Sequence, residues 1–343
     1  MILVSELQSK FTDLITSISG DVKKNFSEVA SFDKAQSDSL IFIHNEKALA
    51  SATTSKASII VISDKLKEKI NIDANKVYIF AKKSDVLISQ ILQTYFNIPA
   101  NSSIRGGVHT SVVLGDNVSI DHSAQIGPNV VIQNNVTIKK GVSIGPNTYI
   151  ASNTLIGENS HIDANNYIGP NTIIKSHVRV LSQNTLGSEP YCYDAKGALL
   201  SAKAGVTLED RVEIGVGNVI ERGLTNQTVI QTGAKLDNRI FIGSESSIGP
   251  HSFLTAGLRI SHNVTTGHHF VCGGGTHIEP NTKICDMVQV AGISCVTKDI
   301  TKPGAYGGFP LQPMRDYLRT SMAMTKIPEL RRDIAKLLNE NEA

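Results

Sequence analysis

Histidine is the side chain in this sequence best suited to acid–base or metal chemistry near neutral pH. Five of the ten histidines lie in one stretch of the second half: His251, His262, His268, His269 and His277. Three histidines that converge on one point could hold a metal ion. Their spacing places no acidic or histidine partner behind such a site, so we expect no metal.

The composition is that of a soluble enzyme or binding protein. The chain has 343 residues, enough for a sizeable core and two or three domains. Its net charge is +2 with both signs dispersed, which argues against a nucleic-acid binder. It shows neither a signal sequence nor a run of about 18 apolar residues, so we expect a cytoplasmic protein without a membrane span. The cysteines lack the paired spacing of zinc sites and are expected to be reduced thiols: Cys192, Cys272, Cys285 and Cys295.

The element that must position these side chains is a six-residue repeat. An aliphatic residue recurs at every sixth position from Leu114 through Leu186, a period that fits neither a helix nor an ordinary strand. A short fixed period of this kind is typical of a parallel β-helix. Three units form one triangular coil, with aliphatic side chains inside and Gly, Asn or Pro at the corners. Because coils stack at strand spacing, about 4.8 Å, residues 18 apart lie above one another.

The repeat divides the chain into three parts. Residues 1–100 lack it and read as a small α/β domain. Residues 101–303 carry it, with an interruption between Leu186 and Leu208 that contains Tyr191 and Tyr193. Residues 304–343 are rich in helix formers and are expected to form a helical arm. We therefore predict a mainly β protein, a left-handed parallel β-helix with an N-terminal α/β domain and a C-terminal helical arm.

Three segments resemble one family over essentially the whole chain. They are the VTLEDRVEIG stretch at 206–215 with the following IERG and LDN motifs, the GAYGGFPLQP stretch at 304–313, and the LIFIHN stretch at 40–45. In this order they are similar to the UDP-3-O-acylglucosamine N-acyltransferases of lipid A biosynthesis. The resemblance implies a homotrimer that transfers a 3-hydroxyacyl group from acyl carrier protein to the 2-amine of the UDP-linked sugar. The donor is carried on the phosphopantetheine of the carrier protein, so no further cofactor is expected.

The resemblance also implies a histidine base, oriented by an aspartate that matches Asp237. The sequence departs from the family at the base position, which is occupied by Ser244. A serine hydroxyl cannot act as a base near neutral pH without a partner. His262 follows Ser244 by 18 residues and is predicted to lie directly above it.

Several interpretations of this departure are open. His262 could have taken over as base, or it could be an ordinary surface histidine. The chain could be a divergent paralogue with altered or lost activity that still binds a nucleotide sugar or acyl carrier protein. A trimeric metal-dependent hydratase on the same scaffold, with histidines converging from neighbouring subunits, is a further alternative.

Other positions match the family's substrate-binding segments. The resemblance assigns Phe42 and Asn45 to the uracil and nearby groups, although the tyrosine expected three residues after Asn45 is Ala48. Phe42 could equally be a core aromatic. The remaining assignments are Tyr191, Tyr193 and Asn238 near the sugar nucleotide, Gly274 beside the phosphopantetheine arm, and Gly292 and Cys295 at the end of the acyl channel. Close packing between coils is the alternative role for Gly274.

The helical arm carries a surplus of positive charge between residues 315 and 336. Acyl carrier proteins are strongly acidic, so a basic arm could steer their docking. We assign this role to Arg315, Arg319, Arg331 and Arg332; a solvated helix face is the alternative interpretation.

Overall fold

The fold is taken from a computed structural model that describes the chain except residues 44, 50–53, 97–106, 309–313 and 341–343. The chain forms two compact units, 1–102 and 103–343. None of the described helices is long and apolar enough to cross a membrane.

The first unit is built on a five-stranded sheet in the order β2-β7-β6-β5-β4. Its strands are β2 (Ile15–Ser19), β7 (Val77–Ala81), β6 (Ile59–Ser63), β5 (Ser39–Ile43) and β4 (Glu28–Val29). All neighbours are parallel except β2 and β7. β6 and β7 are almost entirely buried because apolar clusters cover both faces of the sheet. The other elements are β1 (Ile2–Leu3), α1 (Val4–Lys10), β3 (Asn25–Phe26), η1 (Glu46–Ala48), η2 (Asp64–Lys69) and α3 (Ser84–Tyr95).

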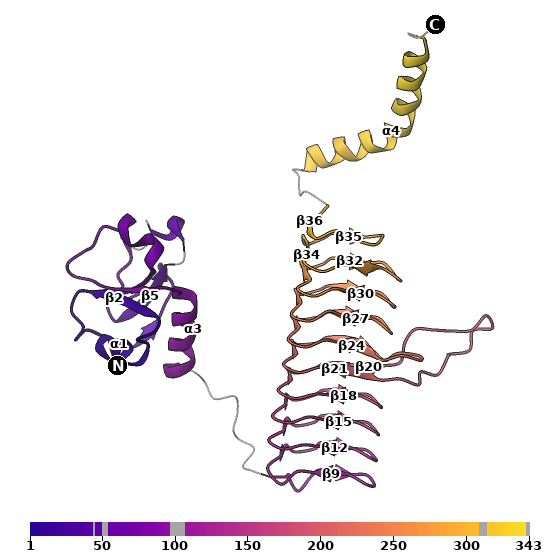
Figure 1. The fold of residues 1–343 in the computed structure, drawn as a ribbon, viewed down its shortest axis with the longest axis horizontal. Helices are drawn as coiled ribbons and strands as arrows, with labels where there is room; N and C mark the ends of the chain where they lie inside the picture. The colour runs from indigo at the N-terminus through magenta and orange to yellow at the C-terminus, as the bar shows by residue number, and fades with distance from the viewer. Residues whose placement is uncertain (44, 50–53, 97–106, 309–313, 341–343) are drawn as a thin grey trace. The chain divides into compact units, whose positions relative to one another are not determined.

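The second unit is the predicted parallel β-helix, which Figure 1 shows from the side as a stack of coils. Its strands form three sheets, here called the first, second and third face in chain order. The first face comprises β8 (Val113–Leu114), β11 (Val131–Ile132), β14 (Tyr149–Ile150), β17 (Tyr167–Ile168), β20 (Thr185–Ser188), β23 (Val219–Glu221), β26 (Phe241–Ile242), β29 (Arg259–Ile260), β32 (His277–Ile278) and β35 (Cys295–Val296).

The second face comprises β9 (Ser119–Ile120), β12 (Thr137–Ile138), β15 (Leu155–Ile156), β18 (Ile173–Ile174), β21 (Val206–Leu208), β24 (Thr228–Ile230), β27 (Ser247–Ile248), β30 (Thr265–Thr266) and β33 (Lys283–Ile284). The third face comprises β10 (Gln125–Ile126), β13 (Ser143–Ile144), β16 (His161–Ile162), β19 (Arg179–Val180), β22 (Glu213–Ile214), β25 (Lys235–Leu236), β28 (Phe253–Leu254), β31 (Val271–Cys272), β34 (Val288–Val290) and β36 (Gly304–Tyr306).

The interior of the prism is the column of aliphatic residues that the six-residue repeat predicts. The weaker inward positions Thr266 and Cys272 are buried as well, and burial raises the pKa of the Cys272 thiol to about 12. Left-handed backbone at the corners is often supplied by asparagine, as at Asn135 and Asn153. At the corner between the first and second faces these side chains hydrogen-bond from coil to coil, with Asn153 Nδ2 donating to Asn171 Oδ1 at 3.1 Å.

Two insertions break the 18-residue step. The loop between β20 and β21 leaves the stack (Figure 1), and a shorter insertion separates β23 from β24. Arg222, which is 7% exposed, ties the longer loop back to the coils. Its Nε donates to the Ala204 carbonyl at 3.1 Å, and its Nη1 lies 3.3 Å from a Glu189 carboxylate oxygen.

The arm is α4 (Met314–Glu340), which bends partway along in Figure 1. Pro328 lies inside the helix and removes a backbone donor, which accounts for the bend. Four exposed apolar side chains recur on α4 at intervals of three or four residues: Ile327, Leu330, Ile334 and Leu337.

Candidate active site

Ser244 and His262 occupy the same position on successive coils, at the corner between the first and second faces. β26 and β29 pair in register, with Phe241 opposite Arg259 and Ile242 opposite Ile260. Ser244 and His262 each follow two residues after the end of these strands. The Asn263 N–H donates to the Ser244 carbonyl at 2.8 Å, which fixes the stacking. The vertical relation predicted from the repeat is therefore confirmed.

Gly243 allows the two coils to approach closely at this corner. A Cβ at Gly243 would lie 2.5 Å from the His262 backbone nitrogen, closer than side chains tolerate. Ser244 is 8% exposed, whereas His262 is exposed to solvent. The histidine is thus the accessible member of the pair.

Glu221 brings a carboxylate to this corner from the coil below. It accepts the Ser244 N–H at 3.0 Å through Oε2 and the Tyr191 N–H at 3.4 Å through Oε1. Burial raises the pKa of Glu221, while these two N–H groups and His262 act in the opposite direction. The carboxylate therefore lies close enough to interact electrostatically with His262.

Glu245 is a second carboxylate in the electrostatic range of His262. It accepts the Thr225 N–H at 2.8 Å, the Asn226 N–H at 3.0 Å and the Thr225 hydroxyl at 2.8 Å. Hydrogen bonding from the Thr225 and Asn226 N–H groups lowers the pKa of Glu245, with a smaller contribution from His262. His262 thus lies within electrostatic reach of two carboxylates, those of Glu221 and Glu245.

Sequence reasoning missed both of these carboxylates. The insertion between β23 and β24 lengthens the step from Ile220 to Ile242 to 22 residues, so the 18-residue ruler does not place Glu221 below this corner. Correcting the ruler for the insertion would have placed Glu221 beneath Gly243. Glu245 follows Ser244 directly in the sequence. The direction of its side chain depends on the left-handed backbone at this residue, φ 58°, which the sequence pattern does not predict.

Asp237 and Asn238 lie at a different corner, between the third and first faces. Asp237 Oδ2 accepts the Ala256 N–H at 3.2 Å, and Asn238 Oδ1 accepts the Val216 N–H at 2.7 Å. Both line a groove of about 380 Å³ on the third face. Within one chain the structure does not bring Asp237 to His262, so the orienting role stays a prediction that needs a second copy.

Comparison with known proteins identifies the family. The bacterial transferase hexapeptide (six repeats) family matches residues 123–157. A UDP-3-O-acylglucosamine N-acyltransferase from Helicobacter hepaticus is 33% identical over 337 residues, 95% of this chain and 96% of the relative. The chain belongs to the UDP-3-O-acylglucosamine N-acyltransferase family. The protein of that name from Coxiella burnetii is 30% identical over 96% of this chain and 97% of its own.

Solved structures of UDP-N-acetylglucosamine acyltransferases are also similar. That from Francisella novicida is 20% identical with a TM-score of 0.45 over 66% of this chain and 79% of its own. That from Arabidopsis is 19% identical with a TM-score of 0.47 over 59% and 69%. The sequence matches confirm the predicted resemblance and an acyltransferase activity.

The ejected loop of this N-acyltransferase reaches the Glu221 corner. Tyr191 is 87% exposed and its ring packs edge-on against that of Tyr193, with centroids 5.0 Å apart. The Tyr191 N–H contact with Glu221 joins the loop to the candidate active site. The role of the two tyrosines near the sugar nucleotide stays a prediction.

Asn238, Gly274 and Gly292 share one corner of the N-acyltransferase, with Ala256 between the first two. The Gly275 N–H donates to the Ala256 carbonyl at 3.1 Å, and the Ile293 N–H donates to the Gly274 carbonyl at 2.9 Å. A Cβ at Gly292 would lie 3.1 Å from the Gly274 oxygen. A Cβ at Gly274 would lie 2.8 Å from the Ala256 oxygen, so the coils pack closely at this corner, and the role of Gly274 beside a phosphopantetheine arm stays a prediction.

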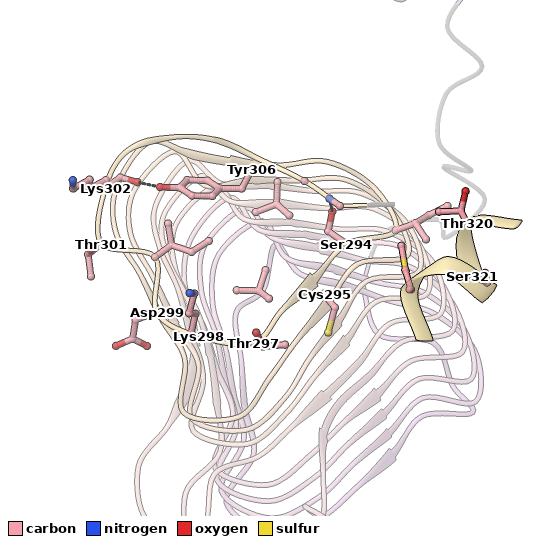
Figure 2. A pocket seen from close by; sticks show the side chains of 17 residues that line it. Ser294, Cys295, Thr297, Lys298, Asp299, Thr301, Lys302, Tyr306, Thr320 and Ser321 are labelled. Atoms are coloured by element: carbon pink, nitrogen blue, oxygen red, sulfur yellow. Dashed lines mark hydrogen bonds between the residues drawn. The ribbon is translucent and has the colours of Figure 1, made fainter. Parts of the chain in front are cut away.

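Cys295 lines a cavity of about 920 Å³ at the carboxyl-terminal end of the β-helix. Figure 2 shows its side chain among Ser294, Thr297 and Lys298, with residues of α4 on one side. The described residues of α4 include exposed side chains at Arg319, Arg331 and Arg332. Arg315 lies on α4, but its side chain is outside the described part of the chain.

Phe42 and Asn45 line one cavity of about 430 Å³ in the first unit. Phe42 is the one residue of β5 that is not fully buried. The structure thus brings these two predicted substrate-binding residues together.

The clustered histidines do not form a metal centre in one chain. Among the residues that the structure describes, no three His, Cys, Asp or Glu side chains are placed to hold an ion. His268 instead contacts Asp286 at 2.9 Å, and the ring of His269 stacks on that of His251 at 5.4 Å. The hydratase alternative requires histidines that converge from neighbouring subunits, so it stays a prediction that one chain does not test.

Proposed function

We propose that this protein transfers a 3-hydroxyacyl group from acyl carrier protein to the 2-amine of UDP-3-O-acylglucosamine. Support comes from a family match over almost the whole chain. The observation that carries the proposal in the structure is the corner where His262, Glu221 and Ser244 meet.

His262 is the general base of this mechanism. It takes a proton from the 2-amine as the nitrogen attacks the thioester carbonyl carbon. The tetrahedral intermediate collapses with cleavage of the C–S bond, and the thiolate leaves with the proton returned by the imidazolium. The product is an amide and a free phosphopantetheine thiol, so no oxidant or further cofactor is needed.

Glu221 positions the base in this scheme. Its carboxylate is held by the Ser244 and Tyr191 N–H groups and stabilises the imidazolium that forms during attack. Ser244, which occupies the family's base position, contributes its backbone N–H to that arrangement. The role of the family's base histidine, whose position Ser244 occupies, is thereby taken by His262 one coil higher.

The working form is a trimer in which the cleft is shared between copies. The outward faces carry apolar side chains that a monomer would leave in water, including Leu155, Ile173 and the stacked rings of Tyr149 and Tyr167. α4 adds four more exposed apolar side chains, Ile327, Leu330, Ile334 and Leu337. A threefold arrangement would let Asp237 of one copy face His262 of the next, because the two lie at different corners.

The direct test is an assay with UDP-3-O-acylglucosamine and 3-hydroxyacyl carrier protein, read by mass spectrometry of the sugar product. Wild type is compared with His262→Ala. Product formation that depends on His262 supports the proposal. Absence of product from a folded wild-type trimer would favour the paralogue that binds these ligands without transfer, for which the replacement at Ser244 is the motivating observation.

A further inference from the structure

The cavity in the first unit lies at the carboxyl ends of two parallel strands. β4 pairs with β5 in parallel register, with Glu28 opposite Ser39 and Val29 opposite Leu40. The chain that follows β4 supplies Phe32 and the chain that follows β5 supplies Asn45, so both reach the same edge of the sheet. This edge is where open α/β sheets bind their ligands.

Two aromatic side chains, one from β5 and one from the turn after β4, line this cavity. Phe42 and Phe32 are both partly buried, and they pack against opposite apolar clusters of the sheet. The Ser55 hydroxyl donates to the Phe32 carbonyl at 3.1 Å and holds this segment in place. A flat apolar group that enters the cavity would therefore find a phenyl ring from each segment.

Asn45 provides the polar group of the cavity. Its Oδ1 accepts the Ala48 N–H at 3.1 Å, which orients the side chain. Its Nδ2 is then the group with hydrogens to donate to a ligand. A ring carbonyl, such as those of a pyrimidine base, is a matching acceptor.

Ala48 also lines the cavity, and its methyl group fills little space. The family resemblance leads to a tyrosine at this position, so one aromatic wall is missing from that side. Phe32 belongs to a segment that the resemblance assigns no role.

We propose that Phe32 is a base-binding residue of this enzyme and replaces the missing ring at position 48. The uracil of the UDP-linked substrate would lie between Phe32 and Phe42 with a carbonyl turned to Asn45. The inference rests on the proposed function for the identity of the ligand. Phe32 is the residue that the geometry adds, and its ring would give this site its affinity for a pyrimidine.

The test is calorimetric titration of the full-length trimer with UDP, which needs no acyl transfer. Phe32→Leu keeps apolar bulk but loses the ring, and is expected to weaken UDP binding about tenfold, equal to about 1.4 kcal/mol. Phe32→Tyr keeps the ring and should bind within about twofold of wild type. The double variant Phe32→Leu with Ala48→Tyr should recover most of the loss, because the ring is restored from the other side.

Thermal unfolding of each variant serves as the folding control. Phe32→Leu that unfolds as wild type and binds UDP as tightly as wild type would overturn the proposal, as would a wild-type chain that does not bind UDP. The acyl-transfer assay is independent of this result. Ring-dependent UDP binding without acyl transfer would leave Phe32 assigned and reject the proposed function.

Discussion

His262 lies directly above Ser244, one coil higher at the same corner, with the Asn263 N–H bonded to the Ser244 carbonyl at 2.8 Å. A base moved by one coil shifts by about 4.8 Å along the prism axis. The acceptor amine and the thioester must then meet one coil higher as well. Glu221 still reaches this corner because its carboxylate extends upward to the Ser244 N–H.

Exchange of these two positions tests the relocated base. His262→Ala should lower kcat by about 10²–10⁴, the usual contribution of a general base. Adding Ser244→His should restore part of that loss, because an imidazole then returns beside Glu221. Initial rates of amide formation at saturating sugar measure both. The exposed His122 provides a matched control, and His262→Ala with wild-type kcat would contradict the assignment.

The shared cleft predicts complementation between inactive subunits. Asp237→Ala and His262→Ala should each be nearly inactive alone. Co-expressed with two different tags and purified as mixed trimers, they should regain about a quarter of wild-type activity. Random mixing makes about three quarters of trimers mixed, and each of these has one intact site of three in a cyclic assembly.

The matched control for this experiment is a mixture in which both changes lie in the same chain. In trimers that mix double-variant and wild-type chains, a site is intact only where two wild-type copies are neighbours. Mixed single variants that stay inactive would contradict a site shared by Asp237 and His262.

The coils were predictable because each repeat specifies its own inward residue, and stacking repeats the same local rule. The site was less so. His262 was found with the ruler of 18 residues, but Glu221 was hidden by the insertion after β23, which changes the step to 22. The role of Phe32 could not be inferred either, because its segment is brought beside β5 by the parallel pairing of β4 with β5, which no motif in the sequence indicates.

Docking of an acidic carrier protein on the arm predicts a salt effect that depends on the donor. Arg331→Glu with Arg332→Glu should raise KM for acyl carrier protein about tenfold, since opposite charges speed and stabilise association. Activity with wild type should also fall as salt rises, because screening shortens the reach of these charges. A short acyl thioester donor should show neither effect. Lys23→Glu is the control, and equal salt responses for both donors would count against docking.

The asparagine ladder predicts a ranked loss of stability at Asn153. This residue has φ 61° and bonds to Asn135 and Asn171. Asn153→Ala should cost about 2 kcal/mol, because alanine loses both bonds and disfavours left-handed backbone. Asn153→Gly should cost about 1 kcal/mol less, since glycine adopts this conformation freely. Urea unfolding at fixed trimer concentration measures the ranking; Ser152→Ala is the neighbouring control.

Glu221 and Glu245 predict opposite dependence of stability on pH. The lowered pKa of Glu245 comes from the Thr225 and Asn226 N–H bonds. Its contribution is therefore complete above the ordinary pKa of 4.5 and is lost as pH falls through the lowered value. Glu245→Gln should cost about 2 kcal/mol at pH 7 and less in acid.

The raised pKa of Glu221 comes mainly from burial. Between pH 4.5 and the raised value the folded chain keeps a proton that the unfolded chain has lost, so stability falls as pH rises. Glu221→Gln removes this penalty, and its stability relative to wild type should improve from acid to pH 7. The two variants therefore shift in opposite directions over one pH range, which thermal unfolding at fixed trimer concentration can measure. If the stability of both variants relative to wild type changed in the same direction with pH, the pKa values of Glu221 and Glu245 would not be shifted in opposite directions. Glu221 would then lose its assigned role beside His262.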